Sequence, residues 1–84
     1  MTSSGICYPN PASNAHILVV NGFEQKKLIV ELFDLQGRRL ETIYNGVADK
    51  KQTFEINVSH LNSGMYFYSV KSEGIHKSIR FIKQ

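Results

Sequence analysis

Short apolar stretches separated by turn-forming residues recur along the whole chain. They lie at residues 6–8, 16–20, 28–34, 38–44, 54–58, 65–71 and 75–82. Within them, apolar residues either alternate with polar ones or form runs of β-branched and aromatic residues, which is typical of β-strands. No stretch has the length and the 3.6-residue period of an amphipathic helix. The pattern therefore predicts seven short strands.

Turn signals follow these stretches about every ten residues. Pro9-Asn10-Pro11 removes two backbone donors, so the chain must leave any sheet there. Asp34-Leu35-Gln36-Gly37 predicts a reverse turn, because aspartate can bond nearby backbone amides and glycine can adopt positive φ. Residues 59–64 predict a tight turn that places Leu61 against one end of the core. We expect glycines to mark strand ends at Gly22, Gly37, Gly46, Gly64 and Gly74.

The distribution of apolar residues also indicates which strands lie at the centre of a sheet and which lie at an edge. Strands 28–34 and 65–71 carry apolar residues on both faces, so both are expected to be central. Strand 38–44 alternates charges with apolar residues and is expected near an edge. Lys77 interrupts the apolar face of the last strand, which predicts a bulge or an exposed end there. Together these features predict an all-β fold, a small antiparallel seven-stranded β-sandwich of immunoglobulin-like character.

The length of 84 residues allows one domain, which we place at residues 6–84. Residues 1–5 are short, polar and small, and we expect them to be a linker or a cloning remnant. Apolar residues make up 42% of the chain and charged residues 20%, as in ordinary globular domains. The apolar runs are far shorter than the roughly 18 residues of a transmembrane helix, so no membrane span is expected.

The formal charge of +3 comes largely from basic pairs at Lys26-Lys27, Arg38-Arg39 and Lys50-Lys51. These pairs lie beside predicted turns and are interpreted as solvated loop charges. The alternative is a patch for phosphate or an anionic polysaccharide. Nucleic-acid binding is not predicted, because the aromatic residues fall mainly on core positions instead of between exposed basic residues.

The sequence contains no arrangement typical of an active or metal site. No nucleophile motif is present, and His16, His60 and His76 are scattered, so we expect surface or half-buried histidines. Cys7 is the single cysteine and is expected to be half-buried near the first strand. We predict no catalytic residue, no metal ligand and no cofactor. Tyr44, Tyr66 and Tyr68 are assigned to the core, with an aromatic sugar-binding platform as the alternative.

Four segments, in order, resemble a known family. They are Y-P-N-P-A at 8–12, V-E-L-F-D-L-Q-G-R at 30–38, L-N-S-G-M-Y-F at 61–67 and K-S-I-R-F-I-K at 77–83. From Cys7 onward, the chain is similar to the type IX (Por) secretion system C-terminal sorting domain of exported Bacteroidetes proteins. The residues that carry the resemblance are Tyr8, Pro9, Asn10, Pro11, Asp34, Gly37, Leu61, Gly64 and Tyr66.

The resemblance implies a non-catalytic signal that directs an attached cargo protein through the periplasm and across the outer membrane, to be secreted or held at the cell surface. The implied partners are the outer-membrane export machinery and a sortase-like peptidase that usually removes the domain. Arg80, Phe81 and Lys83 of the terminal strand are the candidate recognition residues, whereas Gly64 and Tyr66 are expected to hold the structure.

Two alternatives remain open from the sequence. The first is a cell-surface module that binds a carbohydrate or a protein, built on the same sandwich. The second concerns assembly, because exposed edge strands could form a homodimer.

Overall fold

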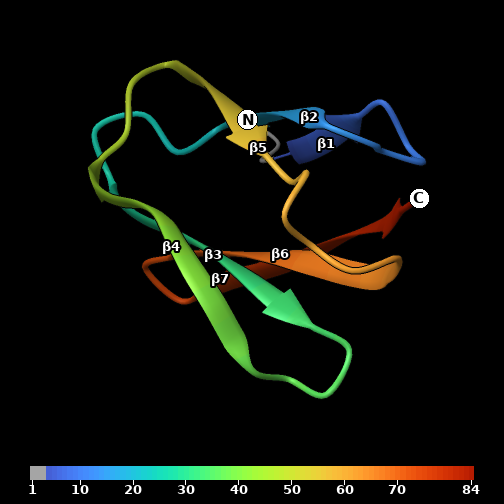
Figure 1. Ribbon diagram of the computed structural model, residues 1–84. Coiled ribbons are helices and arrows are strands. Elements are labelled where there is room, and N and C mark those ends of the chain that lie inside the picture. The colour runs from blue at the N-terminus through green and yellow to red at the C-terminus, as the bar shows by residue number, and fades with distance from the viewer. Residues whose placement is uncertain (1–3) are drawn as a thin grey trace.

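The computed structural model describes residues 4–84 and contains seven β-strands arranged in two layers (Figure 1). The strands are β1 (Ser4–Tyr8), β2 (Ala15–Asn21), β3 (Lys27–Asp34), β4 (Arg39–Val47), β5 (Lys51–Asn57), β6 (Gly64–Ser72) and β7 (Ile75–Lys83). Met1 to Ser3 of the expected linker lie outside the described residues. Gly5, also assigned to that linker, pairs with Val20 within β1.

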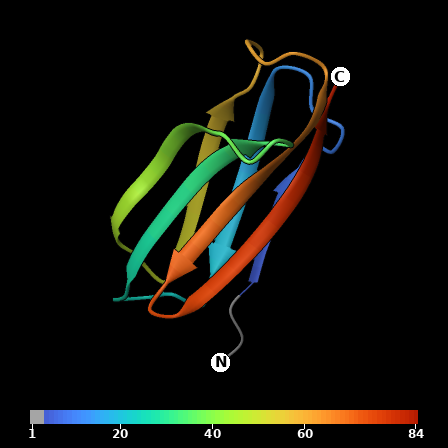
Figure 2. The same ribbon diagram turned by 90° about the horizontal axis from the view of Figure 1, so that it is seen from below.

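The strands form a three-stranded sheet, β1-β2-β5, and a four-stranded sheet, β4-β3-β6-β7. All neighbouring strands are antiparallel. Figure 2 looks onto the four-stranded sheet, with the other sheet behind it. The predicted β-sandwich is confirmed, as are the central positions of β3 and β6 and the edge position of β4. The topology differs from that of an immunoglobulin constant domain. Here β4 pairs with β3, whereas the fourth strand of that domain pairs with the fifth.

The expectation that Gly46 marks a strand end is wrong. Gly46 and its neighbour Asn45 lie within β4, where they pair with Leu28 and Ile29 of β3. A Cβ at Gly46 would lie 3.2 Å from the Tyr44 hydroxyl, which donates to the Val47 carbonyl at 2.6 Å, so a larger residue there would require Tyr44 to shift by a few tenths of an ångström. A glycine can thus mark a close approach of side chains as well as a turn.

The core lies between the sheets and consists of the inward-facing residues of alternate strand positions. Leu28, Val30 and Leu32 of β3 are fully buried, as their spacing predicted. The other apolar core residues are Ala12, Leu18, Val20, Phe23, Ala48, Ile56, Val58, Tyr66, Tyr68, Val70 and Phe81. Leu61 packs against this cluster from the turn after β5, as expected.

His16 is fully buried, so its expected surface or half-buried position is wrong. It occupies an inward position of β2, and its Nδ1 lies 2.9 Å from the Tyr68 hydroxyl. Its ring centroid lies 4.4 Å from that of Phe81. Burial raises the pKa of Tyr68, so its hydroxyl keeps the proton that it can donate to neutral His16. The hydrogen bond compensates for burying the Tyr68 hydroxyl and the Nδ1 atom of His16 in a thin core.

The edges of the sandwich are closed in different ways. At one side β1 lies against β7, close enough that a Cβ on Gly5 would lie 2.6 Å from Ile79 Cδ1. At the other side β4 shows two shifts in its pairing with β3, which interrupt the regular edge. The register of β6 and β7 is continuous through Lys77, so Lys77 marks an exposed position without a bulge.

Replacing Tyr68 with Phe should lower the free energy of unfolding by about 1–3 kcal/mol, because the buried Nδ1 of His16 loses its partner. Urea denaturation measures this loss. Tyr44→Phe is the matched control, since it also removes one hydroxyl bond but from an exposed site. Equal losses for both variants would contradict a special contribution from the buried pair.

Candidate functional site

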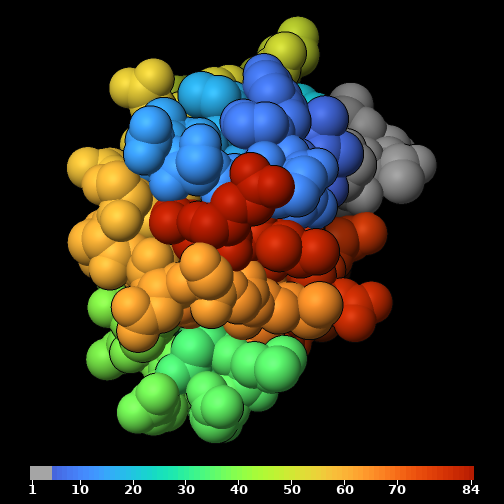
Figure 3. All heavy atoms as spheres, turned by 45° about the vertical axis from the view of Figure 1, so that its right-hand side comes forward, coloured from blue at the N-terminus to red at the C-terminus, as the bar shows by residue number. Residues whose placement is uncertain are grey.

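Four segments that are far apart in the sequence meet at one end of the sandwich. We call this the motif end, and it consists of residues 9–14, 35–38, 58–63 and 83–84. Strands β1, β3, β5 and β7 run toward it, and β2, β4 and β6 run away from it. Figure 3 views it as neighbouring blue, red, orange and green segments. All four segments of the family resemblance therefore contribute to one surface.

The proline loop, residues 9–14, binds the free edge of β7. The Asn10 side-chain oxygen accepts a hydrogen bond from the Ile82 amide at 2.9 Å. The Ala12 amide donates to the Ile82 carbonyl and the Gln84 amide donates to the Ala12 carbonyl, both at 2.8 Å. Ala12 is fully buried at this junction. The loop thus acts as a short extra strand that pairs the end of β7.

The turn between β3 and β4 is stabilised by Asp34, as its sequence predicted. One carboxylate oxygen accepts from the Arg38 amide at 2.9 Å and the other from Arg38 Nε at 2.7 Å. The Gly37 amide donates to the Asp34 carbonyl, and Gly37 has a φ of 85° that favours glycine. The Arg38 backbone amide is the largest of the influences that lower the pKa of Asp34. Asp34 therefore closes the turn with both of its oxygens.

The turn before β6 is held by Tyr66, whose hydroxyl donates to the Asn62 carbonyl at 2.7 Å. A tyrosine at this place, bonded to the backbone shortly before it, is the tyrosine corner of immunoglobulin-like sandwiches. Gly64 has a φ of 153°, which few other residues adopt. Leu61 anchors the same turn on the core. Leu61, Gly64 and Tyr66 of the segment at 61–67 therefore each have a structural role.

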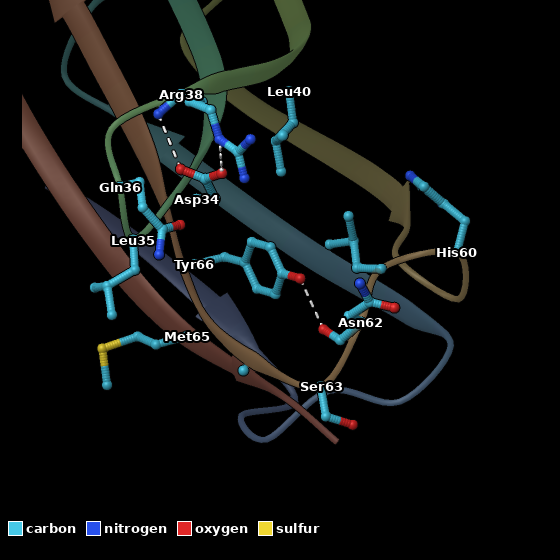
Figure 4. Close-up of a pocket in the computed structure, with 12 residues that line it drawn as sticks. Asp34, Leu35, Gln36, Arg38, Leu40, His60, Asn62, Ser63, Met65 and Tyr66 are labelled. Carbon is cyan, nitrogen blue, oxygen red and sulfur yellow. Dashed lines mark hydrogen bonds and ion pairs between the residues drawn. The ribbon is translucent and has the colours of Figure 1, made fainter.

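A shallow hollow lies between the Asp34 turn and the tyrosine corner (Figure 4). Its lining includes Arg38 and Leu40, which follow the Asp34 turn, and His60 and Met65, which come from the turn after β5 and the start of β6. The Asp34 carboxylate and the Tyr66 hydroxyl are both engaged within their own turns. No group of three or more potential metal ligands occurs in residues 4–84. The hollow offers a contact surface of mixed polarity.

The candidate recognition residues lie in different environments. Arg80 is exposed on the outer face of the four-stranded sheet. Phe81 is 1% exposed and packs against His16, Tyr66 and Tyr68, so a receptor cannot reach it in the folded domain. Lys83 is 8% exposed, and its Nζ donates to the Gln84 carbonyl at 2.8 Å. Because side chains alternate between the two faces of a strand, Phe81 and Lys83 point to the inner face of the sheet. Their expected place on a recognition surface is therefore wrong.

The structure also gives the positions of the tyrosines, the cysteine and the histidines that were considered as binding residues. Tyr66 and Tyr68 are buried, and Tyr44 packs against Phe54, so the three tyrosines form no exposed sugar platform. Cys7 is half-buried, as predicted, and burial raises the pKa of its thiol. His60 and His76 are exposed.

The basic pairs differ from one another. Arg38 and Arg39 form ion pairs with Asp34 and Glu31 at 2.7 and 3.2 Å. Lys26-Lys27 and Lys50-Lys51 are exposed beside the connections at the opposite end, as expected for solvated loop charges.

Sequence reasoning missed the outward-facing residues of the central strands. Apolar residues on both faces of β3 and β6 predict that these strands are central, and the outward-facing ones include Phe33 and Phe67. The register pairs them with each other and places Arg39 and Arg80 beside them. The available signal was an aromatic residue at the same outward position of both predicted central strands.

The described part of the chain contains no helix that is long and apolar enough to cross a membrane. A family model for a secretion system C-terminal sorting domain matches residues 6–84. No curated protein matches the chain.

Replacing Asn10 with Ala should lower the free energy of unfolding by about 1 kcal/mol and speed hydrogen exchange at the Ile82 amide, which loses its acceptor. Denaturation and amide exchange measure the two effects. Asn14→Ala is the control, because Asn14 accepts through its backbone carbonyl, which the variant keeps. Unchanged exchange at Ile82 in Asn10→Ala would contradict the role of the proline loop.

The domain should lose stability as the pH falls below about 6.5, the ordinary pKa of histidine. Burial lowers the pKa of His16, with the Pro9 carbonyl partly offsetting this effect, so the unfolded chain binds a proton before the folded domain does. The contribution of neutral His16 to stability is therefore complete when the pH is above the pKa of His16 in the unfolded chain. It declines as the pH falls from there toward the lower pKa of His16 in the folded domain. The measurement is the urea midpoint between pH 5 and 7.5. His16→Gln should flatten this dependence, whereas the exposed-site variant His60→Gln should keep it.

Proposed function

The chain belongs to the type IX secretion C-terminal sorting domain family, and we propose that its export signal is recognised in the folded state, at the motif end and along residues 79–83 of β7. Domains of this family are non-catalytic secretion signals. They mark cargo proteins that are secreted or attached to the cell surface. Their function implies contact with the type IX machinery. The proposal concerns how this chain presents itself to that machinery.

The observation that carries the proposal is the convergence of four distant segments around the end of β7. A signal read as an unfolded peptide would need only the residues in direct contact with its receptor. Here residues 10 and 12 pair with the terminal strand, and Tyr66 stacks on Phe81 at a centroid distance of 5.7 Å. These contacts give the terminal strand one fixed shape, and a fixed shape lowers the entropy cost of binding.

The roles of the terminal residues divide by burial. Arg80 is exposed, carries no ion pair within residues 4–84, and is the recognition residue that we retain. Phe81 and Lys83 act indirectly, by fixing the course of β7. A sortase-like peptidase then removes the domain, which we take to be residues 6–84. Recognition by the machinery is thus a separate step from the cleavage that releases the domain from its cargo.

The alternative, a cell-surface binding module, lacks the exposed aromatic groove that sugar binding would need from Tyr44, Tyr66 and Tyr68. Homodimerisation through edge strands stays a prediction. It is disfavoured at β4 by the two register shifts and at the end of β7 by the proline loop.

Residues 6–84 fused to an inert, periplasmically exported reporter should carry the reporter to the cell surface or the medium in a host with an intact type IX translocon. Deleting the translocon should abolish this export. Immunoblots of periplasm, surface and medium measure the distribution.

A Tyr66→Phe fusion is the test of recognition in the folded state. It removes the tyrosine-corner bond, and export should fall in proportion to the fraction of the domain that is unfolded, as measured by proteolysis of the fusion. Retention of a folded wild-type fusion in the periplasm of both strains would contradict the proposed function. Full export of a fusion that is unfolded would contradict recognition in the folded state.

A further inference from the structure

A row of four side chains crosses the outer face of the four-stranded sheet. We call it the outer row, and it consists of Arg39, Phe33, Phe67 and Arg80. The register pairs Arg39 with Phe33, Phe33 with Phe67 and Phe67 with Arg80, so one residue comes from each of β4, β3, β6 and β7. Residues directly opposite each other on antiparallel strands share a face and contact each other. The row therefore forms a continuous surface, on the face that Figure 2 presents.

The centre of this surface is apolar. The Phe33 and Phe67 rings stack with their centroids 5.4 Å apart and their planes 9° apart, and both side chains are only partly buried. Beside them Met65 pairs with Ile82, and these side chains are 39% and 45% exposed. Monomeric proteins seldom expose large contiguous apolar surface unless it contacts something. This face is the outer side of the sheet, so the core does not account for its apolar residues.

The charged residues around this centre are mostly positive. Arg39, Lys71 and Arg80 supply three cations, and Glu31 is the acidic residue of the face. Glu31 accepts from Arg39 at 3.2 Å, lies 3.9 Å from Lys71 Nζ, and has 11% of its side chain exposed. The single carboxylate is therefore already paired and covered, whereas Arg80 has no acidic partner within residues 4–84. The face presents excess positive charge around an apolar centre.

We propose that the outer row docks a protein segment of the export machinery that carries acidic and apolar side chains. This inference rests on the proposed function and names the surface and the kind of partner. Charge complementarity favours this occupant over a second copy of the chain, because two such faces would bring like charges together.

Arg80→Glu in the reporter fusion should reduce translocon-dependent export about tenfold, because it places a negative charge against the acidic segment. Phe67→Thr should reduce export by a similar factor through the loss of apolar contact, while threonine preserves the strand. The matched control is Lys77→Glu, which makes the same charge reversal on β7 at an exposed position paired with Val70, away from the outer row. It should export like wild type.

Thermal unfolding of each purified variant separates docking from folding. Export of Arg80→Glu and Phe67→Thr at wild-type levels, with a wild-type fusion that is exported normally, would overturn the docking site and leave the proposed function intact. Equal loss in Lys77→Glu would also overturn it, because the effect would then follow net charge. Failure of the wild-type fusion itself would contradict the proposed function instead.

The partner chemistry is tested by titrating the ¹⁵N-labelled domain with a synthetic peptide of alternating Asp and Leu residues, and with a Lys-Leu peptide as control. The Asp-Leu peptide should shift the amides of the outer row at low salt and less so at high salt. Equal shifts with the Lys-Leu peptide would overturn the acidic partner. Shifts of the same amides on raising the domain concentration alone would identify a second copy as the occupant.

Discussion

The arrangement of the motif end depends on the hydrogen bonds that the proline loop makes with the backbone of the last residues of the chain. An edge strand leaves unpaired amides and carbonyls, and these must find partners or remain open to other chains. Here Asn10 and Ala12 satisfy Ile82, and Ala12 also accepts from Gln84. Because the loop follows β1 of the three-stranded sheet and β7 belongs to the other sheet, these bonds join the two layers. Phe81 precedes Ile82 in β7 and faces the core, where His16, Tyr66 and Tyr68 pack around it.

This junction explains why a thin core contains polar groups. The His16 ring lies on Phe81 and bonds Tyr68, so one side chain connects β2 with both β6 and β7. A purely apolar residue could fill the same volume but could not accept the hydroxyl proton. Buried polar contacts of this kind stabilise one arrangement of the strands relative to the alternatives, in which the polar groups would lose their partners. The two sheets are therefore aligned by a directional bond in addition to non-directional apolar packing.

Local patterns predicted much of this fold, and contacts between distant residues account for the rest. Alternation identified Leu28, Val30 and Leu32 as core residues and β3 as central, because strand geometry depends on neighbouring positions. The Asp34 turn was predictable since its partners lie within four residues. In contrast, the partner of His16 is 52 residues away and that of Asn10 is 72 residues away. Gly46 differs from its predicted place at a strand end because glycine is common in turns, whereas the register with β3 keeps this residue inside β4.

Residues that hold the fold together differ from residues that are free to contact a partner, and this difference bears on recognition. The family segments name residues whose polar atoms are used inside the domain: Asp34 binds Arg38 with both oxygens, the Tyr66 hydroxyl binds Asn62, and the Asn10 side-chain oxygen binds Ile82. Groups that are already bonded have little left to offer a receptor without a cost in stability. On the outer face of the four-stranded sheet, Arg80 has no ion pair within residues 4–84, and the Phe33 and Phe67 rings have no polar atom to bond, so changing them leaves the bonds of the core and the turns in place. A sorting signal built on this sandwich can therefore keep its shape through one set of residues and choose its partner through another.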